Sequence, residues 1–151
     1  MSWMIDEFNI LTGEQGIGTL TGKPLELGGS LGRTQATGHG VALAAKLALE
    51  KLGKSVEEAK FAVQGFGNVG SYTVSTAIEY GATVVAATER DDDGIQYAVY
   101  RAEGLTYDEL QECKDKKVRF HTLPNTKRLT LDEFWALDVD VLCPCALENA
   151  Q

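Results

Sequence analysis

Residues that bind metals or form disulfides are scarce in this sequence. Its 151 residues include three cysteines, Cys113, Cys143 and Cys145, and two histidines, His39 and His121, which lie far apart in the chain. An odd number of cysteines without a secretory leader is typical of reduced thiols in the cytosol, so no disulfide framework is expected. The histidines and cysteines form no recognisable set of ligands, and no metal site is predicted.

Long apolar runs and an excess of basic residues are also missing. No uninterrupted apolar stretch approaches the roughly 20 residues that a membrane span needs. The start of the sequence is acidic and lacks the basic and apolar segments of a signal peptide. The 22 acidic residues outnumber the 14 basic ones, for a net charge of −8. Because nucleic acids and anionic membranes attract basic surfaces, we expect a cytoplasmic protein with neither as a partner.

The sequence does contain the patterns of an ordinary globular domain, with a hydrophobic share of 44%. Apolar residues at steps of three and four predict a helix over residues 1–11. A stretch rich in glycine and proline predicts a loop over residues 12–33. A second helix is expected to open at Thr37 and to end at Leu52, just before a glycine.

The middle of the chain has the pattern of a strand–helix–strand unit. Short apolar runs predict buried strands over residues 61–64 and 83–88, with a helix over residues 68–80 between them. Residues 96–100 are compatible with a short edge strand, and residues 139–143 predict a third buried strand. Such a unit requires a right-handed crossover between parallel strands. The expected fold is therefore α/β, with a Rossmann-like, mostly parallel sheet and flanking helices.

Two short helices are expected in the second half of the chain. Thr106 with Glu109 and Thr130 with Glu133 both have the spacing of a capping box, in which each residue bonds the other's backbone amide. Because only three clear strands are present and no closing helix follows the third, the sheet is expected to be truncated.

A glycine turn between the first strand and its helix is the strongest functional motif. Residues 65–70, Gly-Phe-Gly-Asn-Val-Gly, match G-x-G-x-x-G in the strand–turn–helix context that this motif requires. Gly65 permits the tight turn, Gly67 allows a pyrophosphate to approach the backbone, and Gly70 permits close packing of the helix on the sheet. Phe66, Asn68 and Val69 complete the predicted cofactor-binding turn. The alternative is a tight turn in a domain that binds nothing.

An acidic residue at the end of the second strand indicates which dinucleotide binds. Glu89 follows the turn by about 20 residues, the spacing at which a carboxylate accepts hydrogen bonds from the adenosine ribose. The same carboxylate repels a 2′-phosphate, so NAD is predicted rather than NADP. Arg90 is also assigned to the cofactor site, and its guanidinium could tolerate that phosphate.

Three segments together carry a resemblance to a known family. They are residues 28–41, Gly-Gly-Ser-Leu-Gly-Arg-Thr-Gln-Ala-Thr-Gly-His-Gly-Val, residues 63–70, Val-Gln-Gly-Phe-Gly-Asn-Val-Gly, and residues 146–149, Ala-Leu-Glu-Asn. With these motifs the whole chain resembles the hexameric glutamate dehydrogenases, in the family of Glu/Leu/Phe/Val dehydrogenases. The stretch from residue 88 to residue 100 resembles the NAD-preferring bacterial branch.

The resemblance implies roles for five residues. Thr37 matches a threonine that holds the nicotinamide carboxamide, and Asn68 matches an asparagine that helps to fix the same ring. Arg33 matches an arginine near the substrate, while Ala146 and Asn149 match a loop that lines the cofactor cleft. Each has a structural alternative: Thr37 as a helix N-cap, Asn68 as a cap of its own turn, and Arg33 as a partner in a loop salt bridge.

The resemblance also implies a reaction and an assembly. The family catalyses the reversible oxidative deamination of L-glutamate to 2-oxoglutarate and ammonia, as a homo-hexamer. The lysine and aspartate that act in this chemistry belong to a lobe that the chain does not contain, so no catalytic residue is assigned and the chain alone is expected to be inactive. Residues 1–32 are expected to form a helix and connecting loop, and residues 33–151 a dinucleotide-binding domain that is incomplete at its C-terminus. The alternatives are a stand-alone dinucleotide-binding module or another amino-acid dehydrogenase.

Overall fold

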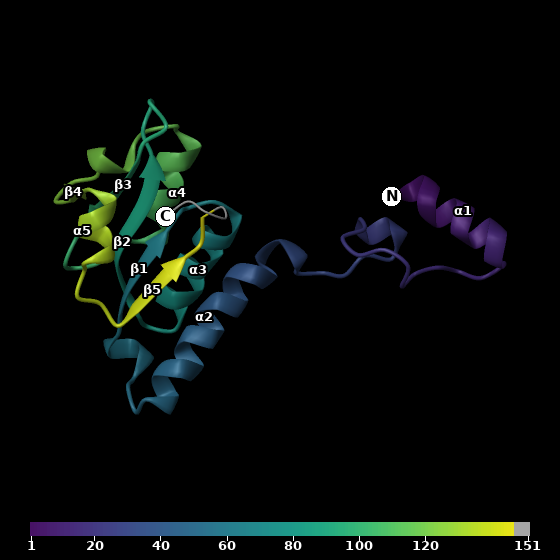
Figure 1. The fold of residues 1–151 in the computed structure, drawn as a ribbon, viewed down its shortest axis with the longest axis horizontal. Coiled ribbons are helices and arrows are strands. Elements are labelled where there is room, and N and C mark those ends of the chain that lie inside the picture. The colour runs from purple at the N-terminus through teal and green to yellow at the C-terminus, as the bar shows by residue number, and fades with distance from the viewer. Residues whose placement is uncertain (147–151) are drawn as a thin grey trace. The chain divides into compact units, whose positions relative to one another are not determined.

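The computed structural model describes residues 1–146 (Figure 1). Contacts between residues divide the chain into two compact units, Met1–Ala36 and Thr37–Gln151. The first unit contains helix α1 (Ser2–Thr12) and a 3-10 turn, η1 (Leu25–Leu27). Gly13 ends α1 in the left-handed conformation, with φ of 70°. In the loop that follows, the ammonium of Lys23 donates to the carbonyl of Ile17 at 2.5 Å. The loop that its glycines predict is therefore stabilised by hydrogen bonding of a lysine side chain to the loop's own backbone.

The second unit is built on a five-stranded sheet in the order β4-β3-β2-β1-β5. The strands are β1 (Lys60–Gln64), β2 (Thr83–Arg90), β3 (Gln96–Tyr100), β4 (Lys127–Leu129) and β5 (Val141–Pro144). β1 pairs in parallel with β2 and β5, whereas β3 is antiparallel to both of its neighbours, β2 and β4. Four of the five strands therefore run in one direction, and the predicted mostly parallel α/β fold is confirmed.

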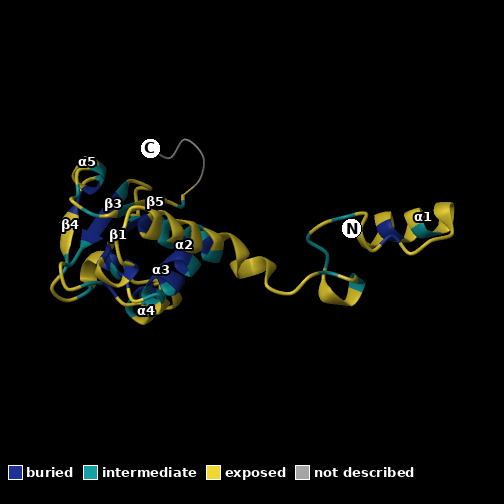
Figure 2. Cartoon of the chain, turned by 90° about the horizontal axis from the view of Figure 1, so that it is seen from below, coloured by how far each residue is buried: buried dark blue, intermediate teal, exposed yellow. Residues whose placement is uncertain are grey.

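Helices cover both faces of this sheet (Figures 1 and 2). They are α2 (Arg33–Lys51), α3 (Asn68–Glu79), α4 (Tyr107–Asp115) and α5 (Leu131–Trp135), with 3-10 turns η2 (Val56–Glu58) and η3 (Phe120–Thr122). Residues of α2, α3 and α4 share the larger apolar cluster, and a residue of α5 belongs to the smaller one. The expected strand–helix–strand unit corresponds to β1, α3 and β2.

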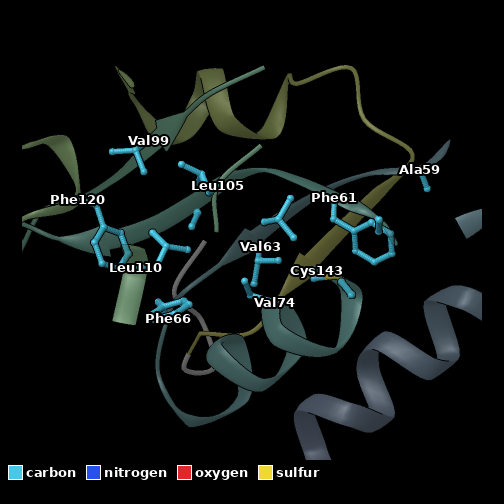
Figure 3. Packing of buried hydrophobic residues seen from close by; sticks show 14 of the residues in the cluster. Ala59, Phe61, Val63, Phe66, Val74, Val99, Leu105, Leu110, Phe120 and Cys143 are labelled. Atoms are coloured by element: carbon cyan, nitrogen blue, oxygen red, sulfur yellow. The ribbon is translucent and has the colours of Figure 1, made fainter. Parts of the chain in front are cut away.

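The core divides in two because side chains alternate along each strand. Phe61 and Val63 of β1 pack with Val74 of α3 in the larger cluster (Figure 3). Ala62, which lies between them in sequence, packs with Phe134 of α5 in the smaller cluster. Small residues on the second face let the short helix α5 approach the sheet closely.

Both predicted capping boxes are present. The hydroxyl of Thr106 accepts a hydrogen bond from the amide of Glu109 at 3.2 Å, and the carboxylate of Glu109 accepts one from the amide of Thr106 at 3.0 Å. Thr130 and Glu133 make the same pair of bonds at the start of α5. These two local patterns alone place the helix starts correctly.

The start of α2 differs from the prediction. The helix begins at Arg33 and not at Thr37, because Gly32 (φ of 81°) makes the preceding turn. The carbonyl of Gly32 accepts a bond from the amide of Ala36 at 3.0 Å, which closes the first helical turn. Thr37 therefore lies one turn inside the helix, and its alternative role as N-cap is wrong.

The edges of the sheet also differ from the prediction. β4 was not expected, and it forms one edge by pairing with β3, so residues 96–100 lie inside the sheet and not at its edge. β5 begins at Val141, later than the predicted residue 139, and includes Pro144. Proline is tolerated in β5 because this strand lies at the other edge, where a backbone donor is not needed on the free side.

Candidate functional site

The glycine turn after β1 depends on two of its glycines for steric reasons. Gly65 has φ of 86°, a conformation that other residues rarely adopt. A Cβ atom on Gly70 would lie 1.9 Å from the carbonyl oxygen of Gly65, so no side chain fits there. The first turn of α3 therefore passes directly against the end of β1, as the motif predicts.

Gly67 differs from these two glycines because space is open above it. A Cβ atom built on Gly67 meets no atom within 4 Å, and its backbone (φ of −81°, ψ of −155°) is extended. Gly67 directly precedes α3, where backbone amides without helical partners and the helix dipole favour an anion. The turn thus has both the room and the charge to take a phosphate group.

A cavity of about 420 Å³ lies over the turn. It is lined by residues 65–69 of the turn, residues 88–90 at the end of β2, Gln96 of β3, and residues 145–146 after β5. The hydroxyl of Thr88 accepts a hydrogen bond from the amide of Gly65 at 2.8 Å and so ties the turn to β2. The carboxyl ends of parallel strands thus meet at the position where α/β sheets bind ligands.

A second cavity, of about 530 Å³, adjoins the first. It is lined by Phe66, Glu89 and Arg90, which also line the first cavity, and by residues 113–114 and 117–120 at and beyond the end of α4. The two cavities share these three residues and are together called the cleft. Glu89 lies where they meet.

The charge around the second cavity is mainly positive, in contrast to the acidic composition of the chain. Arg90, Lys114, Lys117 and Arg119 all line it, against the single carboxylate of Glu89. Such a lining favours a ligand that carries several negative charges.

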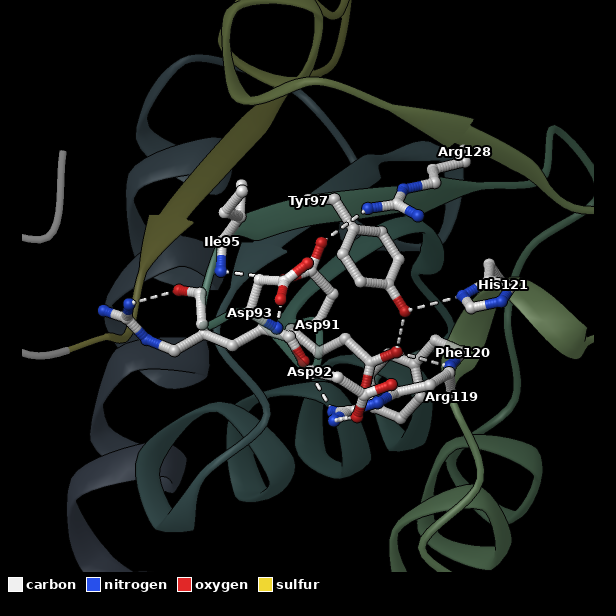
Figure 4. A network of polar contacts seen from close by, with 12 residues as sticks. Asp91, Asp92, Asp93, Ile95, Tyr97, Arg119, Phe120, His121 and Arg128 are labelled. Carbon is white, nitrogen blue, oxygen red and sulfur yellow. Dashed lines mark hydrogen bonds and ion pairs between the residues drawn. The ribbon is translucent and has the colours of Figure 1, made fainter.

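Glu89 is held in place by two hydrogen-bond donors, which come from Tyr97 and Phe120, both labelled in Figure 4. Its Oε1 atom accepts bonds from the hydroxyl of Tyr97 and from the backbone amide of Phe120. Within residues 1–146 no hydrogen bond is made to Oε2. One carboxylate oxygen is therefore used by the fold, and the other is available to a ligand in the cleft.

The side chain of Arg90 is bound to the turn that follows β2. Its Nη1 atom donates to the carbonyl of Gly94 at 2.9 Å. Arg119 donates to the carbonyl of Arg90 at 2.6 Å and forms an ion pair with Asp92 (Figure 4). Both guanidinium groups therefore support the loop between β2 and β3.

The cysteines beside the cleft are packing residues. Burial raises the pKa of the Cys143 thiol to about 12, and it also raises the pKa of Cys145. Both thiols therefore keep their protons near neutral pH and are poor nucleophiles. Cys145 lies 3.7 Å from the hydroxyl of Thr73 on α3, which joins β5 to that helix.

Most of the predicted site residues gather in this cleft. The cleft is lined by residues 65–69, Glu89, Arg90 and Ala146. Gly70 does not line it but packs directly against the carbonyl of Gly65. Phe66 is only 7% exposed and packs its ring against that of Phe120, so it also belongs to the core.

The remaining predicted residues lie elsewhere. Thr37 is exposed on α2 and lines neither cavity of the cleft. Arg33 belongs to the first unit, where it lines a separate cavity of about 450 Å³ with Lys23 and glycines of the loop. Asn149 falls outside the described residues.

Four residues that shape the site were not predicted: Gly38, Thr88, Tyr97 and Phe120. A Cβ atom on Gly38 would lie 2.5 Å from that of Tyr72, so this glycine lets α2 cross α3 closely beside the turn. Its place in a helix rich in small residues was the only signal for this role. Thr88 and Tyr97 could be found only from the strand pairing, and Phe120 only from the packing of η3 against the end of β2.

Two kinds of feature are absent from the described residues. Among residues 1–146 no helix is both long and apolar enough to cross a membrane. In the same part of the chain no three histidine, cysteine or acidic side chains gather as metal ligands.

Comparisons with known proteins extend these observations. The family model described as glutamate/leucine/phenylalanine/valine dehydrogenase matches residues 28–150. The chain is 51% identical over 150 residues to the NAD-specific glutamate dehydrogenase of Clostridioides difficile, and 42% identical over 151 residues to a glutamate dehydrogenase of Thermotoga maritima. These matches cover 99% of this chain but only 36% and 35% of the two relatives. The chain thus spans about a third of the length of the curated relatives it matches.

Solved structures match the same fold. A crystal structure of glutamate dehydrogenase from Peptoniphilus asaccharolyticus superposes with a TM-score of 0.77 at 39% identity, covering 98% of this chain and 32% of that chain. A crystal structure of hetero-hexameric glutamate dehydrogenase from Thermus thermophilus, in its leucine-bound form, superposes with a TM-score of 0.73 at 32% identity. It covers 99% of this chain and 34% of that one.

Proposed function

The chain belongs to the glutamate/leucine/phenylalanine/valine dehydrogenase family, and we propose that it is the dinucleotide-binding part of an NAD-dependent glutamate dehydrogenase. The observation that carries this proposal is the single cleft that runs from the open space above Gly67 to the carboxylate of Glu89. A dinucleotide needs a phosphate site and a ribose site in one groove, and these two residues would supply them.

The residues of the cleft would hold the cofactor in a definite order. The pyrophosphate would bind above Gly67, at the start of α3, where backbone amides point outward. The adenosine ribose would donate its hydroxyls to Glu89, and the rest of the adenosine would enter the second cavity. Asn68, which lines the first cavity with Ala146, would contact the nicotinamide, and the resemblance assigns the same contact to Thr37, which lies on α2 outside the two cavities. When bound, NAD supplies the acceptor for a hydride.

Selection of NAD over NADP would follow from Glu89. A carboxylate accepts hydrogen bonds from ribose hydroxyls but repels a 2′-phosphate. The cations that line the same cavity (Arg90, Lys114, Lys117 and Arg119) would attract that phosphate, so the preference for NAD rests on the hydrogen bonds that the ribose hydroxyls would donate to Glu89. The names of the relatives from Clostridioides difficile and Peptoniphilus asaccharolyticus, both NAD-specific glutamate dehydrogenases, support the same choice.

The complete reaction would be the reversible oxidative deamination of L-glutamate to 2-oxoglutarate and ammonia. In this scheme residues 1–32 form a helix and connecting loop, residues 33–151 form the cofactor-binding domain, and Arg33 lies near the substrate. No catalytic acid or base is assigned within residues 1–151, so the chain alone would bind cofactor without turnover. The whole enzyme would be a cytoplasmic homo-hexamer.

The phosphate site is tested by Gly67→Val. Valine suits the extended backbone at this position and meets no protein atom within 4 Å, so the variant should fold normally. Its two methyl groups would occupy the space of the pyrophosphate, so calorimetric titration should detect no NAD binding, whereas the unchanged chain should bind.

The matched control is Gly40→Val, which also adds a side chain in open space, but on α2 and away from the cleft. It should bind NAD like the unchanged chain. Normal NAD binding by folded Gly67→Val would place the cofactor elsewhere and reject the proposal.

A further inference from the structure

Tyr97 occupies a position that links the sheet to the ligand cleft. It lies on β3 directly opposite Glu89 of β2 in the strand register, so both side chains project from the same face of the sheet. The residue is only 2% exposed. Its hydroxyl contacts Oε1 of Glu89 and lies 3.1 Å from Nδ1 of His121 (Figure 4).

The direction of these hydrogen bonds follows from the groups involved. An ionised carboxylate can only accept, so the single proton of the Tyr97 hydroxyl goes to Glu89. His121 must then be the donor, through Nδ1–H, to a lone pair of the same hydroxyl. Burial and the bond to Glu89 both raise the pKa of Tyr97, so the hydroxyl keeps the proton that it donates.

The ring of Tyr97 cannot easily move away from Glu89. Tyr97 belongs to the larger apolar cluster of the core. The guanidinium of Arg128 lies 4.0 Å from the ring centroid, and it is itself held by Asp91 at 2.9 Å. The hydroxyl is thus presented to Glu89 by a side chain fixed through both packing and a cation–π contact.

We propose that Tyr97 is a positioning residue for cofactor recognition: by holding Oε1 of Glu89, it keeps Oε2 free and directed to the ribose hydroxyls of an adenine nucleotide. The inference rests on the proposed function, because it takes Glu89 as the ribose-binding group. The amide of Phe120 is the second donor to Oε1, so loss of Tyr97's bond should weaken the orientation of Glu89 without abolishing it.

The test is a comparison of two ligands in two proteins. The ligands are ADP and 2′,3′-dideoxy-ADP, which lacks both ribose hydroxyls, and the proteins are the 151-residue chain and Tyr97→Phe. Calorimetry should give a dissociation constant for ADP that is about fivefold to tenfold higher in Tyr97→Phe. The constant for 2′,3′-dideoxy-ADP should be the same in both proteins, because that ligand offers nothing for Glu89 to bind.

Tyr107→Phe is the matched control. It removes the same atom from a tyrosine that packs against the same core cluster, but whose hydroxyl faces Gln111 and not Glu89. Its affinities for both ligands should equal those of the unchanged chain.

The other outcomes contradict the inference, and they differ in which ligand loses affinity. An equal loss of affinity for both ligands in Tyr97→Phe would mean that Tyr97 supports only the fold. Unchanged ADP affinity would mean that Phe120 alone positions Glu89. If the unchanged chain binds both ligands equally, Glu89 is not the ribose group, and if it binds neither ligand, the proposed cofactor site itself is wrong.

Discussion

The two ends of the cleft are built in different ways. The phosphate end consists of consecutive residues, 65–70, and its shape is set by backbone geometry and the absence of side chains. The ribose end brings together Glu89 of β2, Tyr97 of β3 and Phe120 of η3, through side-chain hydrogen bonds across the sheet. The first is a local structure that forms with one turn, whereas the second exists only once distant segments have paired.

This difference determines how each end responds to change. A substitution in the turn acts through steric exclusion, so it has a large effect that salt and pH hardly alter. A substitution around Glu89 removes one of several hydrogen bonds, so its effect is graded. Variants at the two ends should therefore differ in the size of their effects on binding.

The largest effect is expected for Gly70→Ala at the phosphate end. The added Cβ would lie 1.9 Å from the carbonyl oxygen of Gly65, so the turn and the start of α3 must separate. Overpacking of this kind costs about 3 kcal/mol of stability. Urea unfolding should show that loss, and NAD titration should show no binding.

Gly67→Ala is the contrasting variant within the same turn. Its Cβ meets nothing within 4 Å, so its free energy of unfolding should match that of the unchanged chain. Equal stabilities for Gly70→Ala and Gly67→Ala would show that the turn is not sterically constrained as described.

A smaller effect is expected from acid at α4, the helix whose C-terminal part lines the second cavity. The guanidinium of Arg101 lies 2.5 Å from the carboxylate of Glu109, which lowers the pKa of Glu109 from 4.5 to about 2, with help from Thr106. A lowered pKa stabilises the fold above the unfolded value near 4.5, and this contribution is lost as the pH falls toward 2. Because the pair is partly solvated, we expect about 1 kcal/mol.

Glu109→Gln provides the measurement for this pair. The free energy of unfolding of the unchanged chain should fall more steeply between pH 4.5 and pH 2 than that of the variant. α4 carries residues 113–114 of the second cavity. Acid in the same pH range should therefore weaken the binding of adenosine before the fold is lost. Parallel pH profiles for the two proteins would contradict this role of the ion pair.

The local features of the molecule could be predicted from the sequence. The glycine turn, both capping boxes and the strand–helix–strand unit each depend on residues a few positions apart, whose chemistry requires one backbone geometry. The glycine turn and Glu89 were also correctly expected to lie together, because strand ends in a parallel sheet meet at one edge.

The remaining features depend on long-range pairing. The three residues of β4 have no strand pattern of their own, and they form a strand only because β3 offers a free edge. The contact of Tyr97 with Glu89 follows from the register of β2 and β3, which no short motif encodes. The start of α2 was misplaced because Gly38 and Gly40 suggested a helix boundary, whereas Gly32 provides it.

Titration of NAD and NADP into the unchanged chain and into Glu89→Ser tests most directly that the turn and Glu89 form one NAD site. A hydrogen bond to a charged group contributes about 1.5–3 kcal/mol. We therefore expect NAD to bind more tightly than NADP to the unchanged chain, and Glu89→Ser to lose about tenfold or more in NAD affinity and to narrow the gap to NADP. Equal affinities for NAD and NADP in the unchanged chain would contradict the account.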